Sequence, residues 1–437
     1  MAKKSIKNNN LPNVVLVDGC RTPFQRSGTG YRDLTSYDLA RMALQALLNR
    51  TQIDPLKIDR VILGSVIQNV NTSNVAREAA LAAGIPYQVP AVTVTQACIS
   101  SNVAVTMGMD LIRTGQAEII VAGGTESLTD IPIRFRKKFR QKLVEAQKYR
   151  SASDYLKFVK GLRFGDLLPE IPAIAEFSTG RTMGQDCDMM AARLGVTREE
   201  QDQFAVRSHQ AAVSAIKAGL FDNEVEPVET PPDFKPVTKD NGPREDSSLE
   251  KIRKLRPAFI KPHGTLTAAN SSFLTDGASA VLLMSEEAAQ SLGFNPVAYL
   301  RNYVYTGQDP EFEMLLGPAY SIPRVLDGAG LTLEDIDVFE IHEAFAAQVM
   351  ANLKMLASDE FAREKLGRSQ AVGEIPLDKL NNWGGSLSLG HPFGATGTRL
   401  VTTAANRLKH ENGRLAIIAS CAAGAHGHAM LLERYGA

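Results

Sequence analysis

The order of apolar and amphipathic segments is repeated in the two halves of this chain. IDRVILGSVIQNV (58–70) resembles IDVFEIHEAFAAQV (336–349), and AEIIVAGGTES (117–127) resembles RLAIIASCAAG (414–424). Between the members of each pair lies a turn followed by a helical pattern. Alternating strands and helices predict an α/β fold with a central sheet, and the repeat predicts a duplicated unit. Chance similarity of short apolar strands is the alternative explanation.

The middle of the chain, residues 131–265, differs from both halves in composition. It holds basic runs, a loop-like stretch at 229–246 and a helical pattern at 197–219. That pattern opens with Thr197 and a Glu three residues later, which together predict a capping box. The sequence therefore predicts three parts: an N-terminal half at 11–130 completed by 266–293, an inserted loop or substrate domain at 131–265, and a C-terminal half at 294–437.

Bulk composition limits the classes of function. The 437 residues are 44% hydrophobic and 22% charged, as in globular proteins of two or three domains. Lys+Arg and Asp+Glu both number 48, so no overall positive field points to nucleic acid. The four cysteines show no CxxC spacing, which favours a reducing compartment. MAKKSIKNNN shows no targeting pattern and no apolar run approaches the roughly 20 residues of a membrane span, so we expect a cytoplasmic protein.

Two thiols and one imidazole stand in turn-like surroundings of small residues. Cys98 lies in VTQACISSN, His391 in GGSLSLGHPFGATG and Cys421 in IIASCAAGAHGHA. A thiol at the start of a helix is stabilised as the thiolate, so we expect a lowered pKa for Cys98. Together these groups can perform nucleophilic and acid–base chemistry. The alternative is two buried structural cysteines and an exposed loop histidine.

Metal and nucleotide-hydrolysis sites are not predicted. His342 and Glu343 begin HEAFAAQ, but an HExxH zinc motif would need histidine where Ala346 stands. His426 and His428 have no cysteine spacing nearby that completes a ligand set. The glycine-rich loops also lack the lysine and the spacing of a P-loop.

Four sequence blocks together resemble the thiolase family. They are VTQACISSN, HEAFAAQ, GGSLSLGHPFGATG and SCAAGAHGHAM, and the resemblance covers nearly the whole chain after its first dozen residues. Within the family the chain is most similar to the trifunctional-enzyme beta-subunit type, which carries histidine, here His342, where most thiolases have Asn. The resemblance implies a duplicated five-layered α-β-α-β-α fold with an inserted loop domain.

The resemblance also implies a role for each catalytic residue. Cys98 is the nucleophile that takes up the acyl group, and His391 activates it. Cys421 transfers protons to the departing carbon and from the incoming CoA thiol. His342 and His391 stabilise the enolate oxygen, and the backbone N–H groups of Cys98 and Ala423 form a second oxyanion site. Family members commonly have Gly at the position of Ala423, and alanine narrows the permissible backbone geometry there.

Five further residues are implied as contacts of CoA. Arg244 is expected near the adenine or the phosphates, Met183 and Ser272 along the pantetheine, and Ala344 and Phe345 beside the reacting sulfur. The alternative is a solvated arginine and ordinary packing residues. No metal and no cofactor are expected, because CoA is a substrate.

A basic segment runs from Arg134 to Arg163, with eleven Lys or Arg residues against Glu145 and Asp154. Its apolar residues form two clusters, the first at helical spacing: Phe135, Phe139 and Leu143, then Tyr155, Leu156, Phe158, Val159 and Leu162. Such a segment can lie on an anionic membrane surface. In trifunctional-type relatives this region is associated with membrane contact and the acyl-chain path. A solvated loop over the active-site mouth is the alternative.

The predicted function is that of a 3-ketoacyl-CoA thiolase of fatty-acid β-oxidation, an acyltransferase that forms acetyl-CoA and a shortened acyl-CoA. One alternative is the synthetic direction, acetoacetyl-CoA formation by an acetyl-CoA C-acetyltransferase. Another is a non-catalytic membrane-tethering or scaffold subunit. The resemblance implies at least a homodimer and an alpha subunit with enoyl-CoA hydratase and 3-hydroxyacyl-CoA dehydrogenase activity, and no nucleic acid.

Overall fold

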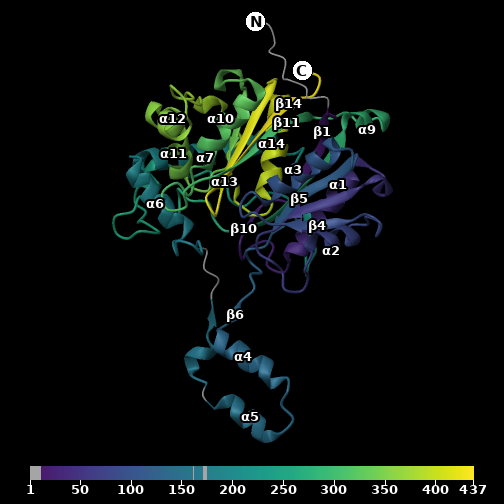
Figure 1. Cartoon of the computed structure of the whole chain (residues 1–437), viewed down its shortest axis with the longest axis vertical. Coiled ribbons are helices and arrows are strands. Elements are labelled where there is room, and N and C mark those ends of the chain that lie inside the picture. Colours follow the sequence, from purple (N-terminus) through teal and green to yellow (C-terminus); the bar gives the residue numbers. More distant parts are fainter. Residues whose placement is uncertain (1–10, 161, 171–174) are drawn as a thin grey trace.

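A large mixed sheet forms the frame of the molecule (Figure 1). The computed structural model describes residues 11–160, 162–170 and 175–437, and ten strands of this described part join the sheet. Their order is β12-β13-β14-β11-β1-β10-β5-β3-β4, with β2 paired to β10. The strands are β1 (Val14–Arg21), β2 (Gln25–Arg26), β3 (Arg60–Gly64), β4 (Ala91–Val94), β5 (Ile119–Glu126), β10 (Thr275–Ser285), β11 (Ala298–Gly307), β12 (Val338–Ile341), β13 (Leu415–Ala422) and β14 (His426–Arg434).

The sheet has two halves with the same internal pairing. In the N-terminal half, β3 pairs parallel with β5, β5 pairs antiparallel with β10, and β10 pairs antiparallel with β1. In the C-terminal half, β12 pairs parallel with β13, β13 pairs antiparallel with β14, and β14 pairs antiparallel with β11. The halves meet where β1 and β11 share a short pairing, Val15 with Tyr299 and Leu16 with Ala298. The strands that resemble each other in sequence thus occupy equivalent places.

Helices and half-sheets alternate in five layers, as the resemblance implies. One apolar cluster fills the space between α1 and α2 and the N-terminal half-sheet, a second surrounds α3 and α14 between the half-sheets, and a third lies between the C-terminal half-sheet and α10 and α11. The helices of these layers are α1 (Ser36–Thr51), α2 (Val75–Ala82), α3 (Ser100–Arg113), α9 (Glu286–Ser291), α10 (Gly317–Ala329), α11 (Ala346–Leu356), α12 (Asp359–Lys365), α13 (Ser386–Leu389) and α14 (Thr396–His410). Short 3₁₀ turns lie at Pro55–Lys57, Phe164–Leu167, Leu333–Asp335 and Leu377–Lys379.

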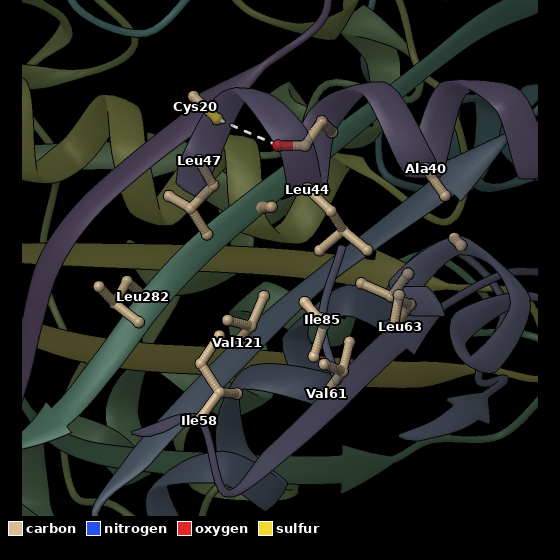
Figure 2. Close-up of a cluster of buried hydrophobic side chains, with 14 of the residues drawn as sticks. Cys20, Ala40, Leu44, Leu47, Ile58, Val61, Leu63, Ile85, Val121 and Leu282 are labelled. Carbon is tan, nitrogen blue, oxygen red and sulfur yellow. Dashed lines mark hydrogen bonds between the residues drawn. The ribbon is translucent and has the colours of Figure 1, made fainter. Parts of the chain in front are cut away.

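Helix α1 illustrates how local sequence produces these layers. Thr35 and Asp38 form a capping box at its N-terminus, and Gln52 ends it in the left-handed region. Leu44 and Leu47 point from α1 toward the sheet, and the Cys20 thiol donates a hydrogen bond to the Ala43 carbonyl at 3.6 Å (Figure 2). This thiol is therefore a packing group of the core.

Residues 131–265 fall into two groups. Helices α4 (Lys137–Ala146) and α5 (Ala152–Val159) stand apart from the rest of the molecule, beyond the paired strands β6 (Arg134–Phe135) and β7 (Pro169–Glu170) (Figure 1). The remaining elements pack on the body, and they are α6 (Met183–Arg193), α7 (Arg198–Lys217), β8 (Val228–Thr230), β9 (Lys235–Val237) and α8 (Leu249–Ile252). Thr197 and Glu200 form the predicted capping box of α7.

The helical spacing expected for Phe135 is wrong, because Phe135 lies in β6, ahead of the helix. Its ring still meets Phe139 at 5.0 Å, and Phe139 meets Phe158 of α5 at 6.0 Å, so aromatic contacts join the two helices. Residue 161 and the side chain of Val159 lie outside the described residues. No helix in the described ranges is long and apolar enough to span a membrane.

Candidate active site

Cys98 lies in a tight turn between β4 and α3. Ala97 before it adopts φ +46°, in the left-handed region, and the Ser100 hydroxyl closes the turn by accepting from the Gln96 N–H at 2.8 Å and donating to the Ala97 carbonyl at 2.7 Å. Helix α3 begins at Ser100, so the predicted helix start at Cys98 is wrong by two residues. The turn holds the half-buried thiol ahead of the helix.

His391 lies in the loop between α13 and α14. Gly390 before it takes φ +109°, and the His391 backbone N–H donates to the Thr275 hydroxyl at 3.0 Å. Its Nδ1 lies 2.7 Å from Thr396 Oγ1. Nε2 has no hydrogen-bond partner among the described residues, although the side chain is buried. The loop therefore fixes the ring and leaves one nitrogen for another group.

His342 directly follows β12, and its backbone N–H donates to the Ala419 carbonyl at 2.8 Å. The ring is held by Ser386, whose Oγ lies 2.9 Å from His342 Nδ1. Within the described residues its Nε2 also lacks a partner. The His342 and His391 ring centroids are 4.0 Å apart, so the two open nitrogens belong to one site.

Cys421 is placed near the end of β13, immediately before the turn to β14. Positive φ angles occur at Gly424 (+81°) and Ala425 (+56°) but not at Ala423. The alanine at 423 is therefore accommodated without left-handed backbone. Its N–H faces the Cys98 sulfur and opposes the rise that burial causes in the pKa of that thiol, and burial together with the neighbouring Cys98 raises the pKa of Cys421. The two sulfurs thus share one site.

The structure brings the predicted catalytic side chains together. Cys98 Sγ and one ring nitrogen each of His342 and His391 lie within 4.8 Å of one another. This spacing would also suit a soft divalent cation, since thiolate and imidazole are preferred ligands of zinc. The expectation that the chemistry needs no metal stays a prediction.

Burial controls the protonation of the site. It raises the pKa of Cys98 to about 12, opposed by the Ala423 N–H, and raises the pKa of Cys421 further still. Burial, assisted by the charge of Arg399, lowers the pKa of His391 to about 3. The pKa of His342 is lowered by burial, by His391 and by Arg399. The lowered thiol pKa expected from the sequence is therefore wrong for the resting site, which holds neutral thiols and neutral imidazoles.

Four of the five expected CoA contacts lie near this centre. Met183, Ala344 and Phe345 belong to the apolar cluster that contains Cys421. Ser272 is tied to the same wall, because its N–H donates to the Ala344 carbonyl at 2.9 Å. Arg244 is exposed on the surface instead. It lies beside Arg26 and His209, whose pKa values are lowered by burial and further by the charge of Arg244.

Several groups of the site carry no sequence signal of their own. Ser386, Thr396 and Arg399 contact or polarise the imidazoles. Ser386 and Thr396 lie inside GGSLSLGHPFGATG and Arg399 lies two residues after it, without spacing that singles them out. Glu176 accepts a hydrogen bond from the Gly424 N–H at 3.0 Å, from a loop distant in sequence. Glu126 is a buried carboxyl whose pKa burial raises to about 8, and it accepts from the Gly394 N–H beside His391.

Comparison with known proteins agrees with this geometry. The N-terminal domain of thiolase matches residues 14–287 and the C-terminal domain of thiolase matches residues 294–434. The human mitochondrial trifunctional enzyme subunit beta is 55% identical over 433 residues, covering 99% of this chain and 91% of the relative. The chain belongs to the thiolase family, and it is an acyltransferase.

Solved structures of the family share the fold. Human mitochondrial 3-ketoacyl-CoA thiolase superposes with a TM-score of 0.84 at 30% identity, covering 98% of this chain and 100% of the other. The Bacillus anthracis acetyl-CoA acetyltransferase gives the same TM-score of 0.84 and the same coverage at 33% identity. The fold alone therefore does not separate degradative from synthetic thiolases.

Proposed function

We propose that this thiolase cleaves 3-ketoacyl-CoA with CoA in fatty-acid β-oxidation, giving acetyl-CoA and an acyl-CoA shortened by two carbons. The observation that carries the proposal is the convergence of Cys98, Cys421 and the unpartnered nitrogens of His342 and His391 in one site. Thiolysis needs two thiols, because one is occupied as the thioester while the other moves protons.

In the first half-reaction, His391 accepts the Cys98 proton as the sulfur attacks the 3-keto carbon. The carbon–carbon bond then breaks, leaving an acyl thioester on Cys98 and the enolate of acetyl-CoA. Cys421 donates its proton to the enolate carbon and releases acetyl-CoA. Because both thiols are neutral at rest, each proton moves only when its acceptor is in place.

In the second half-reaction, Cys421 takes the proton of the incoming CoA thiol. The CoA sulfur attacks the thioester carbonyl, and the shortened acyl-CoA leaves as Cys98 recovers its proton from His391, which becomes neutral again. Cys98 and Cys421 thereby return to their starting states. The cycle is balanced without an external oxidant or reductant.

Two oxyanion sites serve these steps. His342 and His391 face the enolate oxygen, and the N–H groups of Cys98 and Ala423 face the oxygen of the tetrahedral intermediate. A preorganised donor of this kind contributes roughly 3–4 kcal/mol to the transition state. The open Nε2 atoms and the Ala423 N–H directed at the Cys98 sulfur support these assignments.

Binding of CoA is assigned to the wall next to Cys421 and to a surface cation. Met183, Ser272, Ala344 and Phe345 would contact the pantetheine, and Arg244 the adenine or the phosphates. The Phe345 ring packs on Phe259 at 5.8 Å, which keeps this wall rigid. No metal or other cofactor is required by the steps above.

The proposal extends to partners and location. Similarity to trifunctional enzyme beta subunits supports an alpha subunit that carries enoyl-CoA hydratase and 3-hydroxyacyl-CoA dehydrogenase. We infer at least a homodimer in the cytoplasm, with peripheral membrane contact through residues 134–163. The related human subunit is mitochondrial, so fractionation of the source cell is the test of location.

Mass spectrometry tests the catalytic assignment. After mixing with 3-ketoacyl-CoA, the acyl mass should appear on the peptide that contains Cys98 and should be absent in Cys98→Ala. An acyl label on any other peptide would contradict the mechanism. Binding to liposomes without thiolysis would support the scaffold alternative instead.

Chain length separates the two enzymatic alternatives. Thiolysis rates are measured with C4 and C16 substrates, with and without a co-purifying hydratase/dehydrogenase partner. Substantial activity on C16 is expected of a β-oxidation enzyme. Activity confined to C4 would favour the acetoacetyl-CoA-forming acetyl-CoA C-acetyltransferase.

A further inference from the structure

We propose that buried hydrogen-bond networks hold the two active-site imidazoles in opposite tautomers, and that Arg399, acting through Ser386, is the positioning residue that sets the tautomer of His342. The inference rests on the catalytic roles proposed above for His342 and His391. It adds a physical reason why one ring donates a proton while its neighbour accepts one.

The first network runs from Arg399 through Ser386 to His342. A guanidinium can only donate, so Arg399 Nη2 donates to Ser386 Oγ at 3.3 Å. The Ser386 hydroxyl then has its own proton available, and His342 Nδ1 at 2.9 Å is the acceptor that the described contacts offer it. If Nδ1 carried a proton, the buried hydroxyl hydrogen would lose its partner, which is costly. Neutral His342 therefore carries its hydrogen on Nε2.

The second network gives the opposite result for His391. Thr396 Oγ1 lies 3.0 Å from the Pro392 carbonyl and 2.7 Å from His391 Nδ1. A carbonyl only accepts, so the single hydroxyl hydrogen of Thr396 goes to Pro392. Thr396 can make both hydrogen bonds at once only when His391 Nδ1 carries a proton and donates it to Thr396 Oγ1. Neutral His391 therefore has a bare Nε2.

The two tautomers match the two roles. The bare Nε2 of His391 can accept the Cys98 proton, and the Nε2–H of His342 can donate to an oxygen that becomes negative. Both nitrogens are buried without partners in the described structure, so neither is already engaged by a protein group. Depressed pKa values keep both rings neutral, and tautomerism is defined only for neutral imidazole.

The charge of Arg399 is what fixes the direction of the first network. Arg399 is fully buried and anchored by Glu340 at 3.4 Å, and Glu340 is held in turn by Arg407 at 2.7 Å. A glutamine at 399 could accept through its carbonyl oxygen, so Ser386 could turn its hydrogen away from His342. The Nδ1–H tautomer would then be populated, and the oxyanion donor would be lost.

The tautomers are measured by ¹⁵N NMR of the full-length protein labelled on its seven histidines, with no ligand added. His342→Gln and His391→Gln serve only to assign the resonances. We expect Nε2–H for His342 and Nδ1–H for His391. In Ser386→Ala the His342 signal should move toward a mixture of tautomers, and kcat should fall about 10- to 100-fold with little change in KM.

Substitutions at 399 separate positioning from packing. Arg399→Lys keeps a donor-only group and should retain the Nε2–H signal, whereas Arg399→Gln should lose it together with kcat. Arg407→Gln is the matched control, because Arg407 contacts Glu340 but not Ser386 and should leave the tautomer unchanged. If Arg399→Gln does not fold, the His342 tautomer signal and kcat of Ser386→Ala still test the inference.

Two results would overturn the inference: Nδ1–H on His342 in the unsubstituted protein, or a Ser386→Ala variant with unchanged spectrum and kcat. If the protein performs thiolysis but its histidines show the other tautomers, this inference alone is refuted. If the histidines show the expected tautomers but the protein performs no thiolysis, only the proposed function is refuted.

Discussion

Neutralising the basic surface of the α4–α5 hairpin (residues 134–170) should greatly weaken binding to anionic membranes. The change is a quadruple substitution by glutamine at four exposed cations that form no ion pair within the described residues, Lys137, Lys148, Arg150 and Lys160. Lys138 and Lys157 are left intact, because they are paired with Asp166 and Asp154. Removing the four charges therefore leaves the internal contacts of the hairpin in place.

The expected magnitude follows from the number of charges. Each cation near an anionic surface contributes about 1 kcal/mol, so four contribute about 4 kcal/mol. Since about 1.4 kcal/mol is a factor of ten in affinity, binding should fall roughly 1,000-fold. Exposed apolar side chains at the same end, such as Leu156 at 73% and Val144 at 61% exposure, should leave residual binding that does not depend on charge.

The assay is co-sedimentation with vesicles of phosphatidylcholine alone or mixed with phosphatidylglycerol. The matched control replaces by glutamine four exposed cations on the body that likewise form no ion pair within the described residues, Lys57, Lys239, Arg256 and Lys409. Only the hairpin variant should lose binding to the anionic vesicles, and binding of the unsubstituted protein should fall as salt is raised. A loss below tenfold, or an equal loss in the control, would refute the reasoning.

Three further predictions concern the site. Alkylation of Cys98 by iodoacetamide should rise steadily from pH 7 to 9.5, because burial raises its pKa to about 12; a plateau near neutrality would reveal a preformed ion pair with His391. EDTA should leave thiolysis unchanged and added Zn²⁺ should inhibit it; inactivation by EDTA would instead reveal a required metal. Gly124→Ala should lower the melting temperature by several degrees, because its methyl would overlap the Gly394 carbonyl, whereas Gly307→Ala meets no neighbour and serves as the control in the same melt.

Features decided by neighbouring residues could be predicted from the sequence. The capping box of Thr197 and Glu200 is local, so the start of α7 follows from the residues themselves. The repeat of apolar runs predicts a duplicated unit, and in the structure the similar strands β3 and β12, and β5 and β13, occupy equivalent places. The start of α3 could not be read in this way, because the turn at Ala97 is closed by the Ser100 hydroxyl rather than by a recognisable cap.

The sequence blocks predict Cys98, His342, His391 and Cys421 as catalytic residues, but not the groups that determine their protonation. The sequence predicts that the Cys98 thiol lies at a helix N-terminus with a lowered pKa, yet desolvation outweighs the nearby N–H groups and the pKa rises. Burial of this kind depends on every element that packs around the site. The exposed position of Arg244 is likewise a tertiary property that no local pattern encodes.

The fixed charge of Arg399 adds to burial in keeping the resting imidazoles neutral. A proton moved from Cys98 to His391 leaves a thiolate and creates an imidazolium, and burial together with the nearby guanidinium makes that imidazolium unfavourable. Cleavage of the carbon–carbon bond brings a negative charge to this place, because the enolate oxygen is proposed to develop at the Nε2 atoms of His342 and His391. Arg399 therefore disfavours the His391 imidazolium before substrate binds and favours the anionic intermediate afterwards. The Arg399 charge thus disfavours protonation of His391 in the free enzyme and makes that protonation depend on bound substrate.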